Sequence, residues 1–439
     1  MYTGKDGHAP MKNYRLPKQL LLGASTASAQ IEGGDVGHDW REWEKAGKLR
    51  DHSSFTRACD HYVRWKEDID IMAAMGLETY RFSIEWARVE PEEGVLNPDA
   101  LKHYREEILY MKEEGIRPCL TLLHFTVPVW FARRGGFKYP ANARYFLRYV
   151  GLVVRELGDL VSDYVTINEP NVQAFMGYAG QGWPPGETSV LAVYRVLSVM
   201  AGCHIRAYEK IHRMRKRMGF SDTKIGIALH MRAFAPLNPL NTIEKQSVWF
   251  SRKGFQDIPA KAFLTGHFVK PMQNLGGFKQ GTYCDYLGIN YYTRNHVGKP
   301  GDDLTRPQDP KNDYGWEIYP QGLAEVMHEI YAICPKPIWI LENGTCDNDD
   351  QFRSLFIYDQ LAVIADSDLP VERYYHWSFL DNFEWLDGES KRFGLVHVDF
   401  ETQRRTVKKS GQFYREVIGN HGVTHDMVER YLTDENYHC

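Results

Sequence analysis

The sequence has no closely spaced pair of cysteines, its cysteine count is odd, and it has no long apolar segment at its start. Its 7 cysteines are scattered over 439 residues, which argues against both a disulfide framework and a zinc site. The opening stretch MYTGKDGHAPMKNYRLPKQ lacks the apolar core of a signal peptide, and no later stretch is expected to be long enough to span a bilayer. These absences predict a cytoplasmic protein with no membrane partner and no metal. We also expect no cofactor.

The sequence also lacks an excess of charge of one sign. Lysine and arginine total 53 against 57 aspartates and glutamates, giving a formal net charge of −4. Such a balance gives no general attraction to nucleic acid or to an anionic membrane surface. One basic run, Lys210–Arg217, ends a helical pattern just before Gly219, so we interpret it as a solvated helix end. No nucleic-acid partner is expected.

The length exceeds that of most single domains, but α/β barrels often run this long as one unit. With 43% hydrophobic and 25% charged residues, the chain can bury a large core without a metal or disulfides. No linker or low-complexity tract divides it. We expect one domain over residues 1–439. Met11 is a second plausible start, so a disordered or non-native extension at residues 1–10 is an alternative that the sequence leaves open.

Short apolar segments alternate with helical patterns along the chain. One such pattern begins at Asn97-Pro98, a favourable helix start, and closes at Gly115. Eight segments rich in β-forming residues lie at 20–26, 79–86, 117–125, 163–169, 224–231, 285–292, 337–343 and 373–381. No glycine-rich phosphate loop follows the first segment, which argues against a nucleotide-binding open sheet. The alternation therefore predicts an α/β fold, a single (β/α)₈ barrel of the TIM type.

In such barrels the catalytic groups lie at the carboxyl ends of the strands. The expected strand ends are unusually polar: they include Gln30, Arg81, Glu85, His124, Asn168, Glu169, Asn290, Tyr292, Glu342, Asn343, Asp381, Asn382 and Glu384. A lone glutamate at a strand end is more often solvated or ion-paired than catalytic. Two glutamates each followed by a turn, Glu169-Pro170 and Glu342-Asn343-Gly344, indicate a facing pair at one barrel mouth.

Two facing carboxyl groups suit the hydrolysis of glycosides. One donates a proton to the departing oxygen, while the other attacks the anomeric carbon or activates water. Arg81, one strand end away, could keep one of the two charged. Aromatic rings that could stack on a sugar lie in or near the expected mouth loops, although simple packing is the more common role for any single one: Trp130, Trp183, Trp316, Trp377 and Trp385.

Several segments, in this order, resemble glycoside hydrolase family 1, the β-glucosidase family. They cover nearly the whole chain: SAQIEGG (28–34), DHYVRWKEDI (60–69), YRFSIEW (80–86), TINEP (166–170), INYY (289–292), GWEIYPQGL (315–323), ILENG (340–344), WSFLDNFEW (377–385) and RFGLVHVDF (392–400). A triplet such as NEP alone would be weak evidence. So many segments in one order are very specific.

The resemblance implies roles for individual residues. It makes Glu169 the acid/base and Glu342 the nucleophile, with Asn168 on the sugar 2-hydroxyl. It implies that the remaining hydroxyls and the sugar face are bound by Gln30, His124, Trp377, Glu384 and Trp385. The catalytic groups are expected to be oriented by Arg81, Asn290 and Tyr292. The leaving-group side is expected to be lined by Phe125 and Trp316.

Some positions depart from the pattern that the resemblance implies. Phe125 stands where the family usually has tryptophan, and Leu341 where it has threonine. The stretch 344–374 is shorter than usual and carries Cys346 and an acidic cluster of Asp347, Asp349 and Asp350. These differences leave the preferred sugar and leaving group open. Family members that accept 6-phosphorylated sugars usually lack the glutamate found at Glu384, so an unphosphorylated sugar is expected.

The sequence therefore predicts a retaining β-glycosidase, β-glucosidase-like, that acts on a small β-glycoside or oligosaccharide by double displacement. Two alternatives remain open at this point. A transglycosylase would use the same glycosyl-enzyme with a hydroxyl acceptor. A catalytically weak sugar-binding barrel is the other, although the presence of both glutamates argues against it. The oligomeric state is not predicted.

Overall fold

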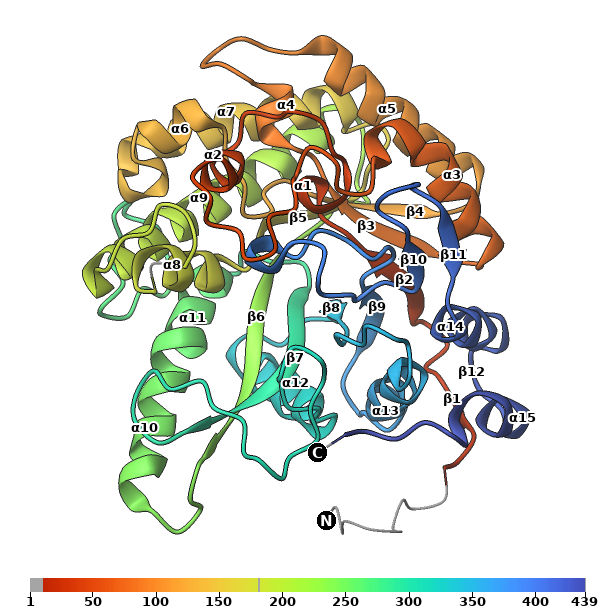
Figure 1. Ribbon diagram of the computed structural model, residues 1–439. Helices are drawn as coiled ribbons and strands as arrows, with labels where there is room; N and C mark the ends of the chain where they lie inside the picture. Colours follow the sequence, from red (N-terminus) through yellow and green to blue (C-terminus); the bar gives the residue numbers. More distant parts are fainter. Residues whose placement is uncertain (1–10, 181, 439) are drawn as a thin grey trace.

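The computed structural model describes residues 11–180 and 182–438, which fold around a closed barrel (Figure 1). The alternative extension at residues 1–10 lies outside the described residues. Parallel strands follow one another round the barrel in chain order, β2 to β9. Their bounds are β2 Leu21–Ser25, β3 Thr79–Ser83, β4 Arg117–Thr121, β5 Asp163–Asn168, β6 Lys224–Pro236, β7 Leu287–Val297, β8 Ile338–Asn343 and β9 Val371–Trp377. Each overlaps one expected segment, so the predicted fold class is confirmed.

Helices connect consecutive strands and cover the outside of the barrel (Figure 1). The main ones are α3 His61–Ala74, α5 Pro98–Glu113, α7 Ala143–Leu157, α9 Val190–Arg217, α11 Ile258–Thr265, α12 Gln321–Ile333, α13 Arg353–Ala365 and α14 Lys409–Asn420. The start of α5 is as expected, because Asn97 Oδ1 accepts from the backbone N–H groups of Asp99 and Ala100.

Shorter elements complete the fold around the barrel mouth and at the chain ends. They are β1 Tyr14–Arg15, α1 Ser28–Ile31, α2 Asp39–Lys45, α4 Trp86–Val89, α6 Val129–Arg133, η1 Gly136–Lys138, η2 Pro140–Asn142, α8 Pro170–Tyr178, α10 Thr242–Arg252, η3 Lys253–Asp257, η4 Trp385–Asp387, β10 Val396–Val398, β11 Arg405–Val407, β12 Gly422–Val423, α15 His425–Met427 and η5 Val428–Leu432. β10 pairs with β11, and β1 pairs with β12, so the first described strand is tied to the end of the chain.

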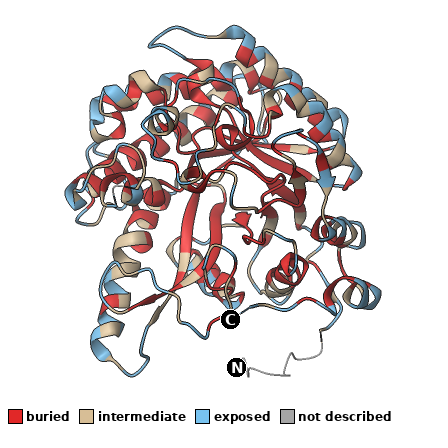
Figure 2. Cartoon of the chain, in the orientation of Figure 1, coloured by how far each residue is buried: buried red, intermediate tan, exposed pale blue. Residues whose placement is uncertain are grey.

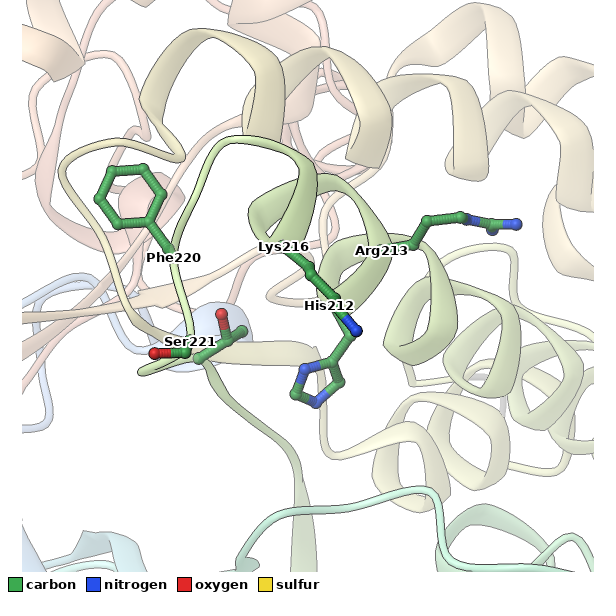
Figure 3. Close-up of a pocket in the computed structure, with 6 residues that line it drawn as sticks. His212, Arg213, Lys216, Phe220 and Ser221 are labelled. Carbon is green, nitrogen blue, oxygen red and sulfur yellow. The ribbon is translucent and has the colours of Figure 1, made fainter.

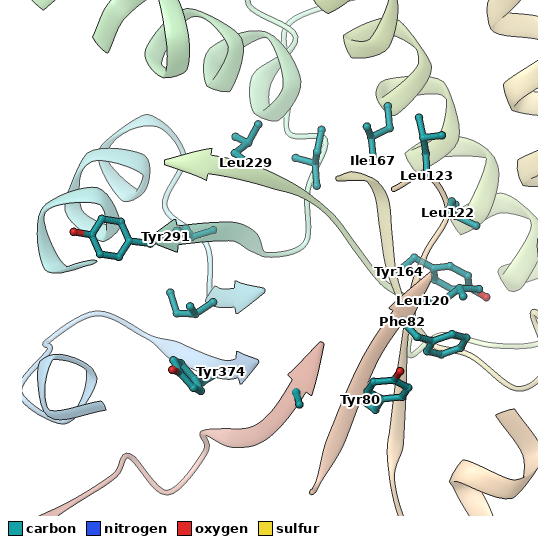
Figure 4. Packing of buried hydrophobic residues seen from close by; sticks show 14 of the residues in the cluster. Tyr80, Phe82, Leu120, Leu122, Leu123, Tyr164, Ile167, Leu229, Tyr291 and Tyr374 are labelled. Atoms are coloured by element: carbon teal, nitrogen blue, oxygen red, sulfur yellow. The ribbon is translucent and has the colours of Figure 1, made fainter. Parts of the chain in front are cut away.

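The apolar core has two layers, one inside the barrel and one between strands and helices. The strands are buried along most of their length, whereas the outer faces of the helices are exposed (Figure 2). Figure 4 shows Tyr80, Phe82, Leu120 and Tyr164 packed in the larger cluster. A second cluster joins side chains of strands that are not neighbours, which is possible only across the interior: Cys119, Val165, Ala228, Tyr286, Trp339, Leu341 and Tyr375. This packed floor supports the polar mouth above it.

Helix α9 corrects two expectations. It is long and apolar enough to cross a membrane by length and composition, but 72% of the relevant window is buried inside the fold, as in a core helix of a globular protein. Its basic end is also not wholly solvated. Arg215 is buried and donates to Thr223 Oγ1 at 2.9 Å and to the carbonyl of Gly158 at 2.5 Å. This arginine therefore fastens α9 to the loops before β5 and β6.

Candidate active site

Glu169 and Glu342 lie at the same mouth of the barrel. Glu169 directly follows β5 and has a left-handed backbone (φ +41°), after which Pro170 begins α8. Glu342 lies near the end of β8, and its register partner on β7 is Asn290, whose partner on β6 is His230. A continuous set of hydrogen bonds links the two carboxyl groups through Arg81, Asn168 and Asn290, so both face the same interior. The predicted facing pair is thus brought together.

The Glu342 carboxyl group has a separate donor for each oxygen. Arg81 Nη1 donates to Oε1 at 2.6 Å, and the Tyr292 hydroxyl donates to Oε2 at 2.6 Å. Arg81 is completely buried on β3, where its Nε also donates to Thr121 Oγ1 at 3.0 Å. A guanidinium does not lose its proton in proteins, so Glu342 has a permanent counter-ion.

Asn168 and Asn290 join the two carboxyl groups into one hydrogen-bonded chain. Arg81 Nη2 donates to Asn168 Oδ1 at 2.7 Å, and Asn290 Nδ2 donates to the same oxygen at 3.1 Å. Asn290 Nδ2 also donates to Glu169 Oε1 at 2.8 Å. The chain therefore runs from Glu342 through Arg81, Asn168 and Asn290 to Glu169.

Glu169 has a neighbour whose contact was not expected from the sequence. His230 Nδ1 lies 2.8 Å from Glu169 Oε1, and Arg232 Nε donates to His230 Nε2 at 2.9 Å. A guanidinium can only donate hydrogen bonds, so His230 Nε2 must accept. The imidazole is then neutral, with its single proton on Nδ1 pointing at Glu169. The only sequence signal for this contact was that His230 and Arg232 are two residues apart on β6, and so point to the same side of the strand, next to Asn290.

The protonation of the pair follows from these contacts. Burial and the Glu169 charge raise the pKa of Glu342 to about 7, against the opposing effects of Arg81 and Tyr292. Burial raises the pKa of Glu169 as well, but a charged His230, with the hydrogen bonds from His230 and Asn290, lowers it below its usual value. Those two shifts would place the proton on Glu342. We assign it to Glu169, because His230 is neutral and Arg81 is not.

Unpartnered polar atoms line the same mouth. His124 accepts from Asn168 Nδ2 through its Nε2 at 3.0 Å, and burial, with the charge of Arg81, holds its pKa well below the usual range. The proton of this neutral ring is therefore on Nδ1. The buried atoms without a hydrogen-bond partner in the described residues include His124 Nδ1, Gln30 Oε1 and Asn290 Oδ1, all at this mouth. One donor and two acceptors of this kind suit the hydroxyl groups of a sugar.

Glu384 lies next to this group and is linked to Gln30. Gln30, on α1, donates from Nε2 to the carbonyl of Phe383 at 2.8 Å and to Glu384 Oε2 at 3.3 Å. Burial raises the pKa of Glu384 to about 8, with further contributions from the charges of Asp387 and Glu342. Near neutral pH this carboxyl group can therefore both donate and accept hydrogen bonds.

Aromatic rings wall the mouth on two sides. Trp377 lies nearly parallel to the His124 ring at 5.7 Å, and Trp385 packs against Trp40 at 4.8 Å and Phe125 at 5.1 Å. Trp183 adds a contact with Phe125 at 4.8 Å. Trp40 was not expected here.

The other two expected tryptophans lie in different places. Trp316 faces Tyr292 at 5.8 Å and so also borders the site. Trp130 lies apart from it, because its Nε1 donates to the carbonyl of Glu90 at 2.9 Å and its ring packs on Trp86 and Tyr145. Four of the five expected tryptophans are therefore close to the mouth.

The departures from the family pattern have structural explanations. Leu341 is buried inside the barrel, and Cys346 packs with Tyr292 and Trp377. Asp347 accepts backbone N–H groups at the start of α13, and Asp350 pairs with Arg353 at 2.7 Å. Asp347 and Asp350 therefore stabilise the start of α13.

Two other clusters of polar side chains lie outside this mouth. A pocket at the end of α9 is lined by His212, Arg213, Lys216, Phe220, Ser221 and Thr223, and it lies at the opposite end of β6 from the mouth (Figure 3). His296, Asp309 and Glu317 form the one group among the described residues with the spacing of a metal site. Arg306 pairs with Asp309 and Arg294 with Glu317, so these carboxylates already have cations.

Comparison with known proteins identifies the family. The model of glycosyl hydrolase family 1 matches residues 12–423. The chain belongs to this family. It is 32% identical to β-glucosidase A of Acetivibrio thermocellus, covering 94% of this chain and 100% of the relative, and 32% identical to the β-glucosidase of an Agrobacterium strain, covering 93% and 97%.

Solved structures of the family agree with this assignment. A β-glycosidase from Pyrococcus horikoshii superposes with a TM-score of 0.86 at 32% identity, covering 96% of this chain and 98% of that one. The Thermotoga maritima β-glucosidase in complex with glucoimidazole gives 0.85 at 30% identity, covering 93% and 100%. This family 1 chain is a glycoside hydrolase that acts on β-glycosides.

Proposed function

We propose that this family 1 enzyme is a retaining β-glycosidase that releases a terminal, unphosphorylated, glucose-like sugar by double displacement. Glu342 is the nucleophile and Glu169 the acid/base. The observation that carries the proposal is the unequal surroundings of the two carboxyl groups. Glu342 has a permanently charged donor in Arg81, whereas Glu169 has only the neutral donors His230 and Asn290.

In the first step, Glu342 attacks the anomeric carbon while Glu169 gives its proton to the departing oxygen. The bond to the leaving group breaks, and an ester forms between Glu342 and the sugar. Negative charge leaves Glu342 and appears on Glu169. The hydrogen bonds from His230 and Asn290 to Glu169 Oε1 stabilise that new charge.

In the second step, Glu169 takes a proton from water, which attacks the anomeric carbon and releases Glu342. Asn168 is placed to hold the sugar 2-hydroxyl, since Arg81 and Asn290 both donate to its Oδ1 and fix its orientation. His124 Nδ1 and Gln30 Oε1, which have no partner among the described residues, bind the remaining hydroxyls together with Glu384, and Trp377 lies beneath the ring.

The stereochemistry of hydrolysis tests this mechanism. Proton NMR of the first sugar released from an aryl β-glucoside should show the β-anomer before mutarotation. The α-anomer would mean that Glu342 activates water instead of attacking carbon. A panel of aryl β-glycosides should give the highest kcat/KM for the glucoside, with the galactoside or fucoside next.

The same intermediate could pass its sugar to another hydroxyl group. The aromatic wall of Phe125, Trp183 and Trp385 would favour such an acceptor over water. Methanol added during turnover should give methyl β-glucoside in proportion to transfer, and free glucose in proportion to hydrolysis.

We also propose a cytoplasmic location, supported by six buried cysteines without disulfides among the described residues.

A further inference from the structure

The carboxyl group of the proposed acid, Glu169, accepts its hydrogen bonds on one oxygen. Oε1 accepts from His230 Nδ1 and from Asn290 Nδ2, each at 2.8 Å. In the described part of the chain, no hydrogen bond reaches Oε2. The proton that a leaving group requires is therefore carried on Oε2, and Oε1 acts as the acceptor of a protonated carboxylic acid.

His230 could compete with Glu169 for that proton. An imidazole with both nitrogens free readily takes a second proton near neutral pH. Here Nε2 is not free, because Arg232 Nε donates to it at 2.9 Å. Arg232 is itself held in place: its Nη1 pairs with Asp303 at 2.8 Å, and its guanidinium lies 5.1 Å from the centre of the Phe255 ring.

We propose that Arg232 is a positioning residue that acts through His230: by donating Nε–H to His230 Nε2 it keeps the imidazole neutral, and so reserves the catalytic proton for Glu169. The proposal rests on the proposed function, since it needs Glu169 to be the acid. This role for the Arg232–His230 pair does not follow from the barrel fold or from the roles of Glu169 and Glu342.

Arg232 prevents the transfer of a single proton from Glu169 to His230. Without its hydrogen bond, one proton can pass from Glu169 to His230, leaving an imidazolium beside a carboxylate. No charge is gained or lost by the pair in this transfer. Only the form with protonated Glu169 can assist the leaving group, and that form becomes a minority.

The other charged and titratable groups around the pair do not remove this competition. Glu342 on β8 and Glu384 in the loop after β9 are negative when ionised, and they favour a proton on either His230 or Glu169. Arg81 on β3 reaches Glu169 only through Asn168 and Asn290. Tyr292 on β7 lies parallel to the His230 ring at 5.8 Å. Asp303 faces Arg232.

The experiment compares Arg232→Met with wild type on two substrates. An alkyl β-glucoside needs its leaving group protonated, whereas a dinitrophenyl β-glucoside does not. We expect kcat/KM for the alkyl glucoside to fall about tenfold at neutral pH, part of the roughly 100- to 10,000-fold that a general acid contributes. The dinitrophenyl value should stay near wild type.

The pH profile separates this effect from simple misplacement. Once the pair has lost its proton, His230 no longer competes, and the charge of Arg232 lowers the pKa of Glu169, so Arg232→Met contains at least as much protonated Glu169 as wild type. The loss on the alkyl glucoside should therefore shrink as the pH rises, and the basic limb of the profile should move to higher pH. A loss of equal size at every pH would overturn the proposal.

A double-mutant cycle gives the second test. In His230→Asn, the side-chain amide nitrogen takes the place of Nδ1 and can donate to Glu169, but it cannot be protonated. Arg232→Met should then cost about tenfold when His230 is present and nothing in the His230→Asn background. Equal losses in both backgrounds would overturn the proposal, as would no loss in either.

Controls separate folding and the proposed function from this inference. Arg105→Met removes another arginine paired with an exposed aspartate, Asp159, and should leave both substrates unchanged. Arg232→Lys, which keeps a charge for Asp303 but has carbon in place of Nε, should behave like Arg232→Met, and it replaces that variant if the latter fails to fold. If Glu169→Gln keeps its activity on the alkyl glucoside, the proposed function itself fails, whatever Arg232 does.

Discussion

Tyr292 donates a hydrogen bond of 2.6 Å to Glu342 through the carboxylate oxygen that Arg81 does not contact. Both donors stabilise the ionised form, and both are buried. The hydroxyl group of Tyr292 therefore helps to keep Glu342 ionised, the form that attacks carbon.

Tyr292→Phe should raise the pKa of Glu342, because a hydrogen bond to the charged form is lost. Such a bond is worth about 1.5–3 kcal/mol, equivalent to about one to two pH units. Glu342 attacks only when ionised, so the acidic limb of kcat/KM should move to higher pH by that amount. Tyr291→Phe is the matched control, since Tyr291 donates to the carbonyl of Tyr319. An unmoved limb in Tyr292→Phe would contradict this role.

The two glutamates should respond differently to substitution. Glu169→Ala should slow alkyl glucosides far more than dinitrophenyl glucosides, because a good leaving group needs little protonation. Azide should restore turnover of the glycosyl-enzyme and yield the β-glycosyl azide. Glu342→Ala should be nearly inactive without azide and should give the α-glycosyl azide with it. Product NMR distinguishes the two anomers, and the opposite pattern would exchange the roles.

Glu384 should set the preference against phosphorylated sugars. With its pKa raised to about 8 by burial, it ionises as the pH passes through 8. Repulsion of a 6-phosphate should therefore grow from pH 7 to pH 9, and KM for the 6-phosphoglucoside should rise relative to that for the glucoside. In Glu384→Gln this relative change should vanish. A wild-type preference for the phosphorylated substrate would contradict the prediction.

A buried ionic cluster outside the mouth should make stability depend on pH. His61 contacts Asp68 at 2.7 Å and Glu107 at 3.1 Å, and Arg405 also binds Asp68. Burial alone lowers the pKa of His61, but the two acids raise it to about 10. This group's contribution is therefore complete below the unfolded pKa of about 6.5 and is lost as the pH rises through about 10.

His61→Asn should lower the free energy of unfolding by about 3–5 kcal/mol near pH 6, because it leaves the buried Glu107 without its cation and Asp68 with Arg405 alone. Denaturant titrations should show the gap to wild type closing toward pH 10. His328→Asn, at an exposed ion pair with Asp368, should have little effect. A gap that stays constant with pH would argue that the imidazole contributes packing only.

The sequence was sufficient for the barrel because its strands are short apolar segments bounded by turns, a pattern set by local chemistry. The same reasoning placed Glu169, Glu342 and Arg81 at one mouth, since parallel strands in a closed barrel end on one side. The mutual contacts of Asn168, Asn290 and Tyr292 depend on register, which periodicity does not give.

The contact between His230 and Arg232 was beyond such reasoning. Strand β6 was expected to end at Met231 but continues to Pro236, and β7 runs beside it to Val297. This extension keeps Arg232 in the sheet, where its side chain can reach His230. Trp40 was missed because α2 lies in a loop whose packing against Trp385 is set by tertiary contacts alone.

The complete burial of Arg81 has a consequence for enzymes altered at the nucleophile. Replacing Glu342 with glycine leaves a guanidinium in the interior with no negative partner, a costly arrangement for a fold to tolerate. The vacated space is of carboxylate size, so formate should restore the lost ion pair by binding there. Such a variant would melt at a temperature that depends on the concentration of small anions. The anions in its storage buffer would then help to determine the thermal stability of this variant.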